Sequence, residues 1–429
     1  MEKRMKLINN VWLLLGLICA NQQTLAYNQA NYDEVLNNAT RNYSYFDLSG
    51  APLDGLVRTG ANWTGANLNS AGLVGSDFSN GIFNQATLIS ATANNLNVTG
   101  SAIYDANFTA ASLPNALIIS CTVVACQFVN ANLTSASFNS SKLVADDFSS
   151  ATLITATFHN TIISSCEFNN ANLSNVNLSV AALTQYLDFT SAILTSANFS
   201  STNLTGAFLD KVSGTNLNLT NATFTQGSAY LASFVNAQFN GANCTDTYFS
   251  VSDFTGADLS GANFTNCTLE YTNLTNSRLN TATIMRGASL RSASLQSAII
   301  TGSLIADSAI FDGSTMQGIN LNGASLTNAQ LSLTDMSGNS TFINANLTGA
   351  NLKRSLLNSA NFTNANLTNA SFARADITNA NFTNAQALNT FFVYANGTNA
   401  NFSGANLTNA DMLGASFMGA NFANATLPV

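Results

Sequence analysis

Charged residues, proline and histidine are all scarce in this chain. Only 8% of the 429 residues are charged, and there are three prolines and one histidine. The 13 basic residues are too few and too scattered for the basic stripe with which a protein neutralises several nucleic-acid phosphates. His159 has no serine or cysteine placed beside it as in a catalytic triad. The rarity of proline leaves backbone N–H groups free for continuous β-ladders.

Metal sites, disulfides and phosphate-binding loops also lack their sequence signatures. One of the six cysteines, Cys19, lies near the N-terminus, and the remaining five are an odd number with no Cys-x-x-Cys pair. This argues against a disulfide scaffold or a zinc site. The 26 glycines are spread through the chain instead of forming a phosphate loop, and the carboxylates are scattered. We therefore expect no catalytic residues, no cofactor and no metal.

A period of five residues runs through the chain from about Leu48 to Leu427. Ala360–Asn364 reads A-N-F-T-N and Ala405–Asn409 reads A-N-L-T-N. This period matches neither the helical repeat of 3.6 residues nor the strand repeat of two. A sequence with 46% hydrophobic residues in strict phase can bury a core, which excludes a disordered low-complexity tract. The chain is therefore a repeat protein.

The unit resembles the pentapeptide-repeat family, whose consensus is A-[N/D]-L-x-x. The resemblance implies an all-β, right-handed, four-sided parallel β-helix with four pentads in each coil. The centre residue and the small residue two positions earlier then point inward. We expect residues 48–429 to form a single β-helix domain of about 19 coils, on the order of 90 Å long at the strand spacing of about 4.8 Å.

Four pentads per coil predict that residues 20 apart stack in columns of similar side chains. Two predicted core columns near the C-terminus consist of Phe342, Phe362, Phe382, Phe402 and Phe422, and of Leu347, Leu367, Leu407 and Leu427. Ala387 interrupts the second column. Thr383, one position beyond Phe382, is expected to face water. Asp146 is unusual because the register places a carboxylate at an inward position.

The register also predicts four one-residue insertions. Centres step by six from Leu183 to Phe189, Ile284 to Leu290, Ile305 to Phe311 and Met336 to Phe342. An extra residue must be accommodated at a corner, and irregular points on a regular scaffold often carry recognition residues. The predicted interaction loops are at Tyr186, at Arg286, and at Ser337, Gly338 and Asn339.

Two sets of charges also fall 20 residues apart. Asp258 and Arg278 are expected to stack as a surface ion pair worth at most about 1 kcal/mol. Arg354 and Arg374 place like charges one coil apart, with Lys353 alongside. These three basic residues are either solvated or form a small anion-binding spot, which is too small for nucleic acid.

The first 26 residues have the composition of a secretory signal peptide. Lys3, Arg4 and Lys6 precede the apolar run Val11–Ala20, and Thr24-Leu25-Ala26 is a small-residue cleavage site. The run is too short to span a membrane. A lipoprotein anchor at Cys19 is disfavoured because the preceding residue is isoleucine. We expect a secreted or periplasmic protein.

Residues 27–47 are expected to be an N-terminal cap that contains a short helix. Asn31 is the predicted N-cap, with Glu34 three positions later. No similar segment follows Leu427, so the final coil is expected either to be sealed by its own pentads or to associate end to end with another copy.

Three functions remain compatible with the sequence, and none is enzymatic. The first is a secreted scaffold that binds a protein or a glycan through its polar faces and inserted loops. The second is suggested by family members that mimic DNA and protect DNA gyrase, although this chain lacks dense surface carboxylate and a cytoplasmic address. The third is ice or surface binding through threonine ladders, which are formed by Thr363, Thr383, Ser403, Thr348, Thr368 and Thr408.

Overall fold

The computed structural model describes residues 27–37, 40–280 and 282–428. The predicted signal peptide, residues 1–26, lies outside the described residues. The chain divides into two compact units, Met1–Lys142 and Leu143–Val429. The single domain 48–429, its total number of coils and its length remain predictions, because all three assume one uninterrupted stack.

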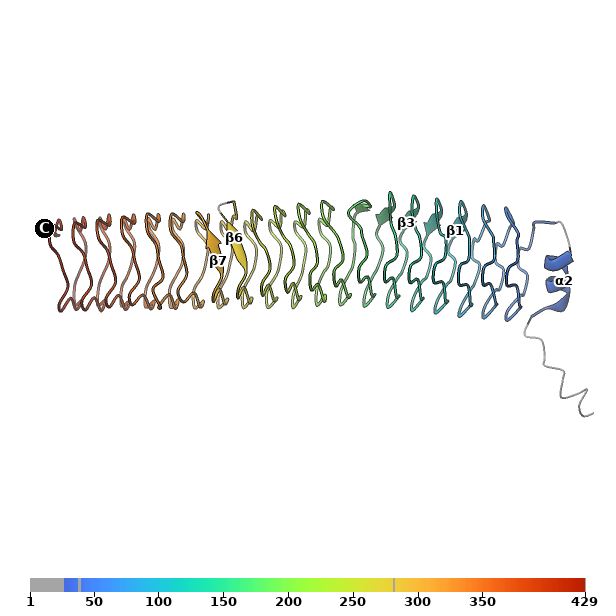
Figure 1. Cartoon of the computed structure of the whole chain (residues 1–429), viewed down its shortest axis with the longest axis horizontal. Coiled ribbons are helices and arrows are strands. Elements are labelled where there is room, and N and C mark those ends of the chain that lie inside the picture. The colour runs from blue at the N-terminus through green and yellow to red at the C-terminus, as the bar shows by residue number, and fades with distance from the viewer. Residues whose placement is uncertain (1–26, 38–39, 281, 429) are drawn as a thin grey trace, which may run out of the picture. The chain divides into compact units, whose positions relative to one another are not determined.

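Each unit is a parallel β-helix with four pentads per turn. In unit 1, Asn42 pairs in parallel with Asn62, which pairs with Ile82. In unit 2, Asn361 and Asn381 are paired in the same way. Successive bridges within a turn are five residues apart, so four columns of bridges give each turn four sides. The expected all-β parallel β-helix is confirmed, and Figure 1 shows its turns lying side by side within each unit.

Seven three-residue strands lie in the described residues, where the bridges are extended. They are β1 (Ala102–Tyr104), β2 (Thr122–Val124), β3 (Lys142–Val144), β4 (Ile162–Ser164), β5 (Ala182–Thr184), β6 (Arg278–Asn280) and β7 (Ile299–Thr301). β1 pairs in parallel with β2 in unit 1. In unit 2, β4 pairs with β5 and β6 pairs with β7.

The corners explain why asparagine, glycine and serine recur in the repeat. In the pentad of Phe362, the carbonyl oxygen of Phe362 accepts a hydrogen bond from the N–H of Ala365 at 3.0 Å. Asn364, the third residue of this turn, has a φ of 58°. A positive φ at this position is typical of a type II turn, which favours glycine or asparagine. The positive φ of the backbone therefore favours glycine and asparagine at this position, in addition to the need for a polar surface residue.

The centre residues fill the core as stacked rings and aliphatic side chains. Phe342 and Phe362 stack with centroids 4.6 Å apart, and Phe382 and Phe402 stack at the same spacing. Every member of the phenylalanine column from 342 to 402 is completely buried, as are Leu347, Leu367 and Leu407. Stacked aromatic rings contribute packing beyond their buried area.

The last described turn departs from this pattern. Phe422 is only half-buried, and Leu427 is 53% exposed. The prediction that Leu427 is a core residue is therefore wrong, because no described coil lies beyond it to cover its side chain.

Helix α2 (Gln29–Asn37) occupies the region where a cap was expected. It begins earlier than predicted, since the side-chain oxygen of Asn28 accepts the N–H of Asn31 at 3.2 Å. Asn28 is therefore the N-cap, and the assignment of Asn31 to that role is wrong.

Two contacts hold the helix against the first turns of unit 1. Val35 is completely buried. At the C-terminal end of the helix, the Arg58 guanidinium donates to the carbonyl oxygens of Val35 and Leu36, at 2.9 Å and 3.0 Å. A cation at this end also complements the helix dipole. None of the helices in the described residues is both long and apolar enough to cross a membrane.

Candidate binding groove

Most surface amides of the repeat bond to one another. We use the name Asn row for Asn361, Asn381, Asn401 and Asn421, which occupy one column of unit 2. The amide nitrogen of Asn401 donates to the oxygen of Asn381 at 3.3 Å, and Asn421 donates to Asn401 at 3.1 Å. Each amide of the row therefore bridges adjacent turns.

The hydroxyl groups beside the Asn row are also engaged. The Oδ1 atom of Asn381 accepts both the N–H of Thr383 at 3.1 Å and its hydroxyl at 2.6 Å. The threonine oxygen in turn accepts from the amide of Asn401 at 2.9 Å. Thr383 is partly exposed, whereas Phe382 before it is buried, and its hydroxyl is held by these bonds as well as facing the surface. The asparagine and threonine of the A-N-x-T pattern therefore hydrogen-bond each corner to the next turn.

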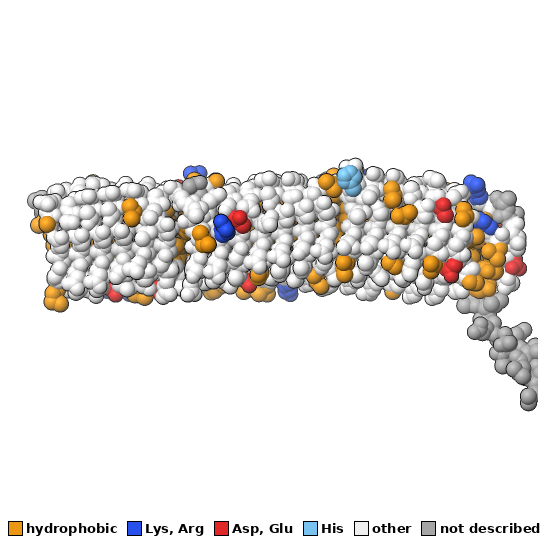
Figure 2. Space-filling model, viewed as in Figure 1, with side chains coloured by type: hydrophobic (Ala, Val, Ile, Leu, Met, Phe, Trp, Pro, Cys, Tyr) orange, Lys and Arg blue, Asp and Glu red, His pale blue; other side chains and the backbone are white. Residues whose placement is uncertain are grey.

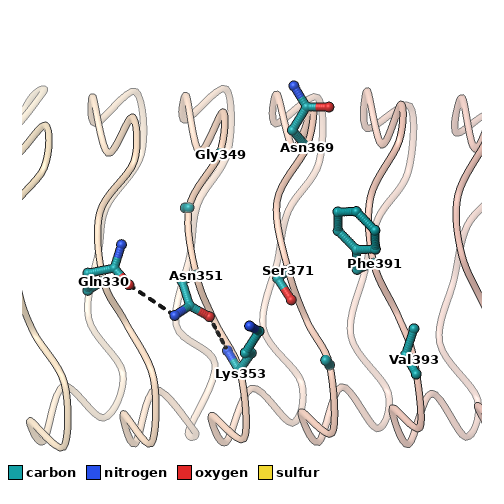
Figure 3. Close-up of a pocket in the computed structure, with 10 residues that line it drawn as sticks. Gln330, Gly349, Asn351, Lys353, Asn369, Ser371, Phe391 and Val393 are labelled. Atoms are coloured by element: carbon teal, nitrogen blue, oxygen red, sulfur yellow. Dashed lines mark hydrogen bonds between the residues drawn. The ribbon is translucent and has the colours of Figure 1, made fainter.

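A second row, two pentads away from the Asn row and therefore on the opposite side of the four-sided turns, is interrupted and forms a groove. We use the name groove row for Gln330, Asn351, Ser371 and Phe391, which are successive bridge partners in unit 2 (Figure 3). A pocket of about 500 Å³ opens over this row. Its lining consists of Gln330, Gly349, Ala350, Asn351, Lys353, Asn369, Ser371, Ala373, Phe391 and Val393.

Side-chain size explains the hollow. Ser371 and Ala373 are small residues at positions that other turns fill with larger side chains, namely Asn351 and Lys353 on one side and Phe391 and Val393 on the other. The amide of Asn351 donates to Gln330 at 2.9 Å, but Ser371 has no amide with which to continue this ladder. The groove row therefore ends in a half-polar, half-apolar depression.

The groove brings a cation and an aromatic ring to opposite ends of the depression. The oxygen of Asn351 accepts the backbone N–H of Lys353 at 3.3 Å, which fixes the amide orientation. In Figure 3 the Lys353 side chain lies between Asn351 and Ser371, and the Phe391 ring lies on the turn beyond Ser371. Phe391 is 46% exposed in a row whose other members are polar. Sequence reasoning missed this site, although comparing residues 20 apart would have shown the change from amide to serine to phenylalanine.

The three residues of the predicted anion spot occupy two kinds of position. Lys353 lines the groove, whereas Arg354 and Arg374 occupy positive-φ corner positions. The guanidinium carbon of Arg374 lies 5.7 Å from the centre of the Tyr394 ring, which is a cation–π contact. The anion spot itself remains a prediction.

Two predicted insertions lie where the register placed them. Tyr186 follows β5, has a φ of 44° and is 75% exposed. Ser337, Gly338 and Asn339 form a widened turn, after which the bridge separation becomes 21 residues, from Asn320 to Thr341. Both sites offer side chains outside the regular rows.

The insertion predicted at Arg286 is misplaced. Ile284 is a bridge partner of Asn263 and of Ile305, so both isoleucines face outward instead of occupying centres. The buried centres are Met285 and Ala306. Arg286 is therefore an ordinary corner residue.

The extra residues fall one pentad earlier than predicted, between Leu279 and Met285 and between Ile300 and Ala306. The sequence misleads here because an isoleucine beside a methionine or an alanine fits the apolar centre equally well. Arg286 instead forms an ion pair with Asp307, with 3.6 Å between Nε and Oδ2.

The charge pair predicted at Asp258 and Arg278 consists of direct bridge partners. Burial raises the pKa of Asp258, but hydrogen bonds from Ser260 and Asn240, with the charge of Arg278, outweigh this effect and hold the pKa below 3.8. The ionised form of Asp258 is thus stabilised mainly by local hydrogen bonds, and the charge of Arg278 contributes less.

Asp146, Cys121 and Cys166 are buried side chains that can ionise. Asp146 is buried at the inward position that the register gave it. Burial raises the pKa of the Cys166 thiol to about 12, with a further contribution from the charge of Asp146. Burial likewise raises the pKa of Cys121 to about 11, so these thiols stay protonated at neutral pH.

His159 is exposed, and Figure 2 shows the chain's one histidine on a face made mostly of uncharged polar groups and backbone. Within the described ranges, no group of three or more His, Cys, Asp or Glu side chains is placed to hold a metal ion.

Solved structures similar to this chain are pentapeptide-repeat proteins of low sequence identity. QnrB1 after trypsin treatment, a plasmid-mediated fluoroquinolone resistance protein, is 18% identical, with a TM-score of 0.28, over 42% of this chain and 91% of its own. Rfr23 from the cyanobacterium Cyanothece 51142 is 20% identical, with a TM-score of 0.21, over 28% and 90%. HetL from Nostoc, involved in heterocyst differentiation regulation, is 17% identical, with a TM-score of 0.12, over 68% and 89%.

Comparison with curated proteins found no significant match. A family model described as pentapeptide repeats, in contrast, matches well over half of the chain. The matched residues are 47–85, 147–179, 188–228, 232–270, 242–280, 263–304, 307–338, 345–384 and 395–428. These segments have the five-residue unit and the parallel turns described above, and the chain therefore belongs to the pentapeptide-repeat family.

Proposed function

We propose that this protein is an extracytoplasmic, non-enzymatic scaffold that binds a macromolecular partner, a protein or a glycan, where its repeat is interrupted. The observation that carries the proposal is the contrast between the self-bonded Asn row and the open groove row. A partner gains little from amides and hydroxyls that already bond to one another. It gains more at the groove and at the two protruding insertions, where groups lie outside the ladders.

The composition of residues 1–26 supports the extracytoplasmic location. A basic start, a short apolar run and a small-residue cleavage site are typical of a signal peptide. N-terminal sequencing of the protein from its native host is expected to give a chain that begins near Tyr27. Recovery of the protein from cytosol with residues 1–26 attached would contradict this location.

A pull-down from native medium or envelope fractions tests the binding role. Deletion of Tyr186 and deletion of Gly338 restore the regular register at the two exposed insertions, and Ser371→Trp fills the groove. We expect the single variants to fold and at least one of them to lose the partner. Retention of the same partner by a variant that combines all three changes would place the interaction elsewhere. Thr195→Ser, a conservative corner change, serves as the matched control.

Protection of DNA gyrase is an alternative function, suggested by the activity of other family members. The chain contains 21 acidic and 13 basic residues in 429, which gives a low density of negative charge for a DNA mimic. We expect the chain without residues 1–26 to leave gyrase supercoiling unchanged at micromolar concentration and to give no protection against quinolones. Salt-sensitive inhibition or protection would reverse the ranking of the two functions.

Ice binding is less well supported by the side-chain contacts. The hydroxyls of Thr348, Thr368 and Thr408 each donate at 2.7 Å to the asparagine two positions earlier. Threonines whose hydroxyls are used in this way present fewer groups with which to order water. Absence of thermal hysteresis in a freezing assay is the expected result.

The final described turn supports end-to-end self-association as a further partner proposal. The centres Met412, Phe417 and Phe422 are only half-buried there, and Leu427 is 53% exposed. A second copy could cover these side chains in the way that successive turns cover one another. Sedimentation velocity is expected to show a dimer that Leu427→Asp weakens, whereas a monomer at all concentrations would contradict it.

A further inference from the structure

We infer that the groove of unit 2 binds an acidic sugar residue within a saccharide. This inference deepens the proposed function and rests on it, because it names the chemistry of the partner at one of the proposed contact points. It follows from three features of the groove: a half-exposed ring, a fixed amide and a single cation around a hollow.

The hollow is large enough to receive a ligand group. Its volume of about 500 Å³ falls within the range typical of small-molecule sites. Its floor is made by Ser371 and Ala373, whose small side chains leave space between the turns that carry Lys353 and Phe391. A ligand bound there would contact the turns on both sides.

Phe391 provides the apolar side of the site. The residue is 46% exposed, although large apolar side chains in this protein are mostly buried between turns. The face of an aromatic ring is electron-rich and attracts positively polarised C–H groups. A pyranose ring presents such C–H groups on one face and hydroxyls around its edge. It therefore matches a site with one aromatic wall and polar groups beside it.

The polar groups select hydroxyls and one negative charge. The hydrogen bonds with Gln330 and with the backbone of Lys353 use one amide hydrogen and one lone pair of Asn351, so its amide is ordered before a ligand arrives and still has a second hydrogen to donate. An ordered donor and acceptor costs less entropy to use in binding. The hydroxyl of Ser371 lies on the floor, and the Lys353 ammonium lies beside it in Figure 3. One ammonium group pairs with one carboxylate.

A nucleic acid fits the same site poorly. It would stack a base on Phe391, but its backbone needs several cations along a strand. The groove lining has one, Lys353, and the whole chain has a net charge of −8. A single uronate residue in the groove needs only one cation for its carboxylate, and its ring hydroxyls match the amide and hydroxyl groups beside Lys353.

Calorimetry with the full-length chain tests the inference. The probes are tetramers of galacturonate, glucuronate, mannuronate and guluronate, each compared with its methyl ester, which keeps the ring and removes the charge. We expect at least one tetramer to bind, and its ester to bind about tenfold more weakly. Phe391→Ala is expected to weaken both forms by about tenfold, and Lys353→Met only the acid form.

Phe208→Ala is the matched control, because Phe208 occupies the same bridge position in another turn of unit 2 and is also 46% exposed. It is expected to leave binding unchanged. Thermal melts check that every variant is folded, and Ser371→Trp gives a second way to block the groove without removing Phe391.

The outcomes separate this inference from the proposed function. Absence of binding to all four tetramers overturns the acidic-sugar assignment, and so does equal binding of acids and esters or equal loss in Phe208→Ala and Phe391→Ala. In those cases a protein partner lost on deletion of Tyr186 or Gly338 would still support the scaffold. If the pull-down finds no partner but uronate binding depends on Lys353, the groove would still be an acidic-sugar site. The protruding loops would then have no role in binding.

Discussion

The Asn row and the groove row run along the same turns of unit 2 and have opposite properties. In the Asn row, every amide meets a partner one turn away, and the threonines beside Asn361 and Asn381 donate their hydroxyls to the amide oxygens of these two residues. In the groove row, the ladder that starts with Gln330 and Asn351 ends at Ser371 and Phe391. In the regular rows, the surface amides and hydroxyls therefore bond to one another. Polar groups become available to other molecules where the row is interrupted.

The largest expected difference is in the free energy of unfolding lost when Phe382, beneath the Asn row, or Phe391, on the groove row, is changed to alanine. Phe382→Ala is expected to destabilise the protein by about 3 to 5 kcal/mol, because it leaves a cavity between the stacked rings of Phe362 and Phe402. Phe391→Ala is expected to cost about 1 kcal/mol or less, since its ring is already half-exposed. Denaturant unfolding measures both, and similar losses would mean that the two rows do not differ in this way.

A smaller effect is expected from the amide ladder itself. Asn381→Ala removes the acceptor of two bonds from Thr383 and of one from Asn401, and is expected to cost about 1 to 3 kcal/mol. Ser371→Ala on the groove row is the control and is expected to stay within about 0.5 kcal/mol. If the serine variant is the less stable of the two, the ladder does not stabilise the corners.

The hydroxyl of Thr383 provides a finer test of the same row. Thr383→Val keeps the branched shape but removes a donor to Asn381 and an acceptor for Asn401. The expected cost is about 0.5 to 1.5 kcal/mol. A change too small to measure would restore the simpler view, taken from the sequence, that this residue only faces water.

The smallest effect concerns the insertion at Ser337, Gly338 and Asn339. Burial raises the pKa of Asp335, but donors from Ser337 and Gln317 outweigh this effect and hold the pKa below its ordinary value of 3.8. The folded state thus favours the carboxylate, so this stabilisation is present above pH 3.8 and is lost as the pH falls through the folded pKa. A carboxyl NMR titration is expected to show the lowered pKa. Ser337→Ala removes the hydroxyl donor and should move the pKa back up, and no movement would exclude the Ser337 hydroxyl, though not its backbone N–H, as a cause.

The corrections show where a one-dimensional pattern loses information. The period of five identified centre positions at Phe382 and Leu367, because only a large apolar side chain fits there repeatedly. It failed at Ile284 and Ile305, where two adjacent residues are both acceptable in a core and only the pairing of turns shows which one faces inward. It also placed the helix cap at Asn31 instead of Asn28, since both residues can accept the same type of bond.

The sequence by itself determined the family, the four-pentad turn and the phenylalanine and leucine columns down to Leu407, because these follow from which side chains recur every five and every 20 residues. Only the tertiary structure decided which polar groups remain available. Hydrogen bonding of Asn381 with Thr383 and Asn401 depends on the distance between adjacent turns, and the groove depends on how small Ser371 is relative to neighbours 20 residues away. Those relations exist only once the turns are stacked.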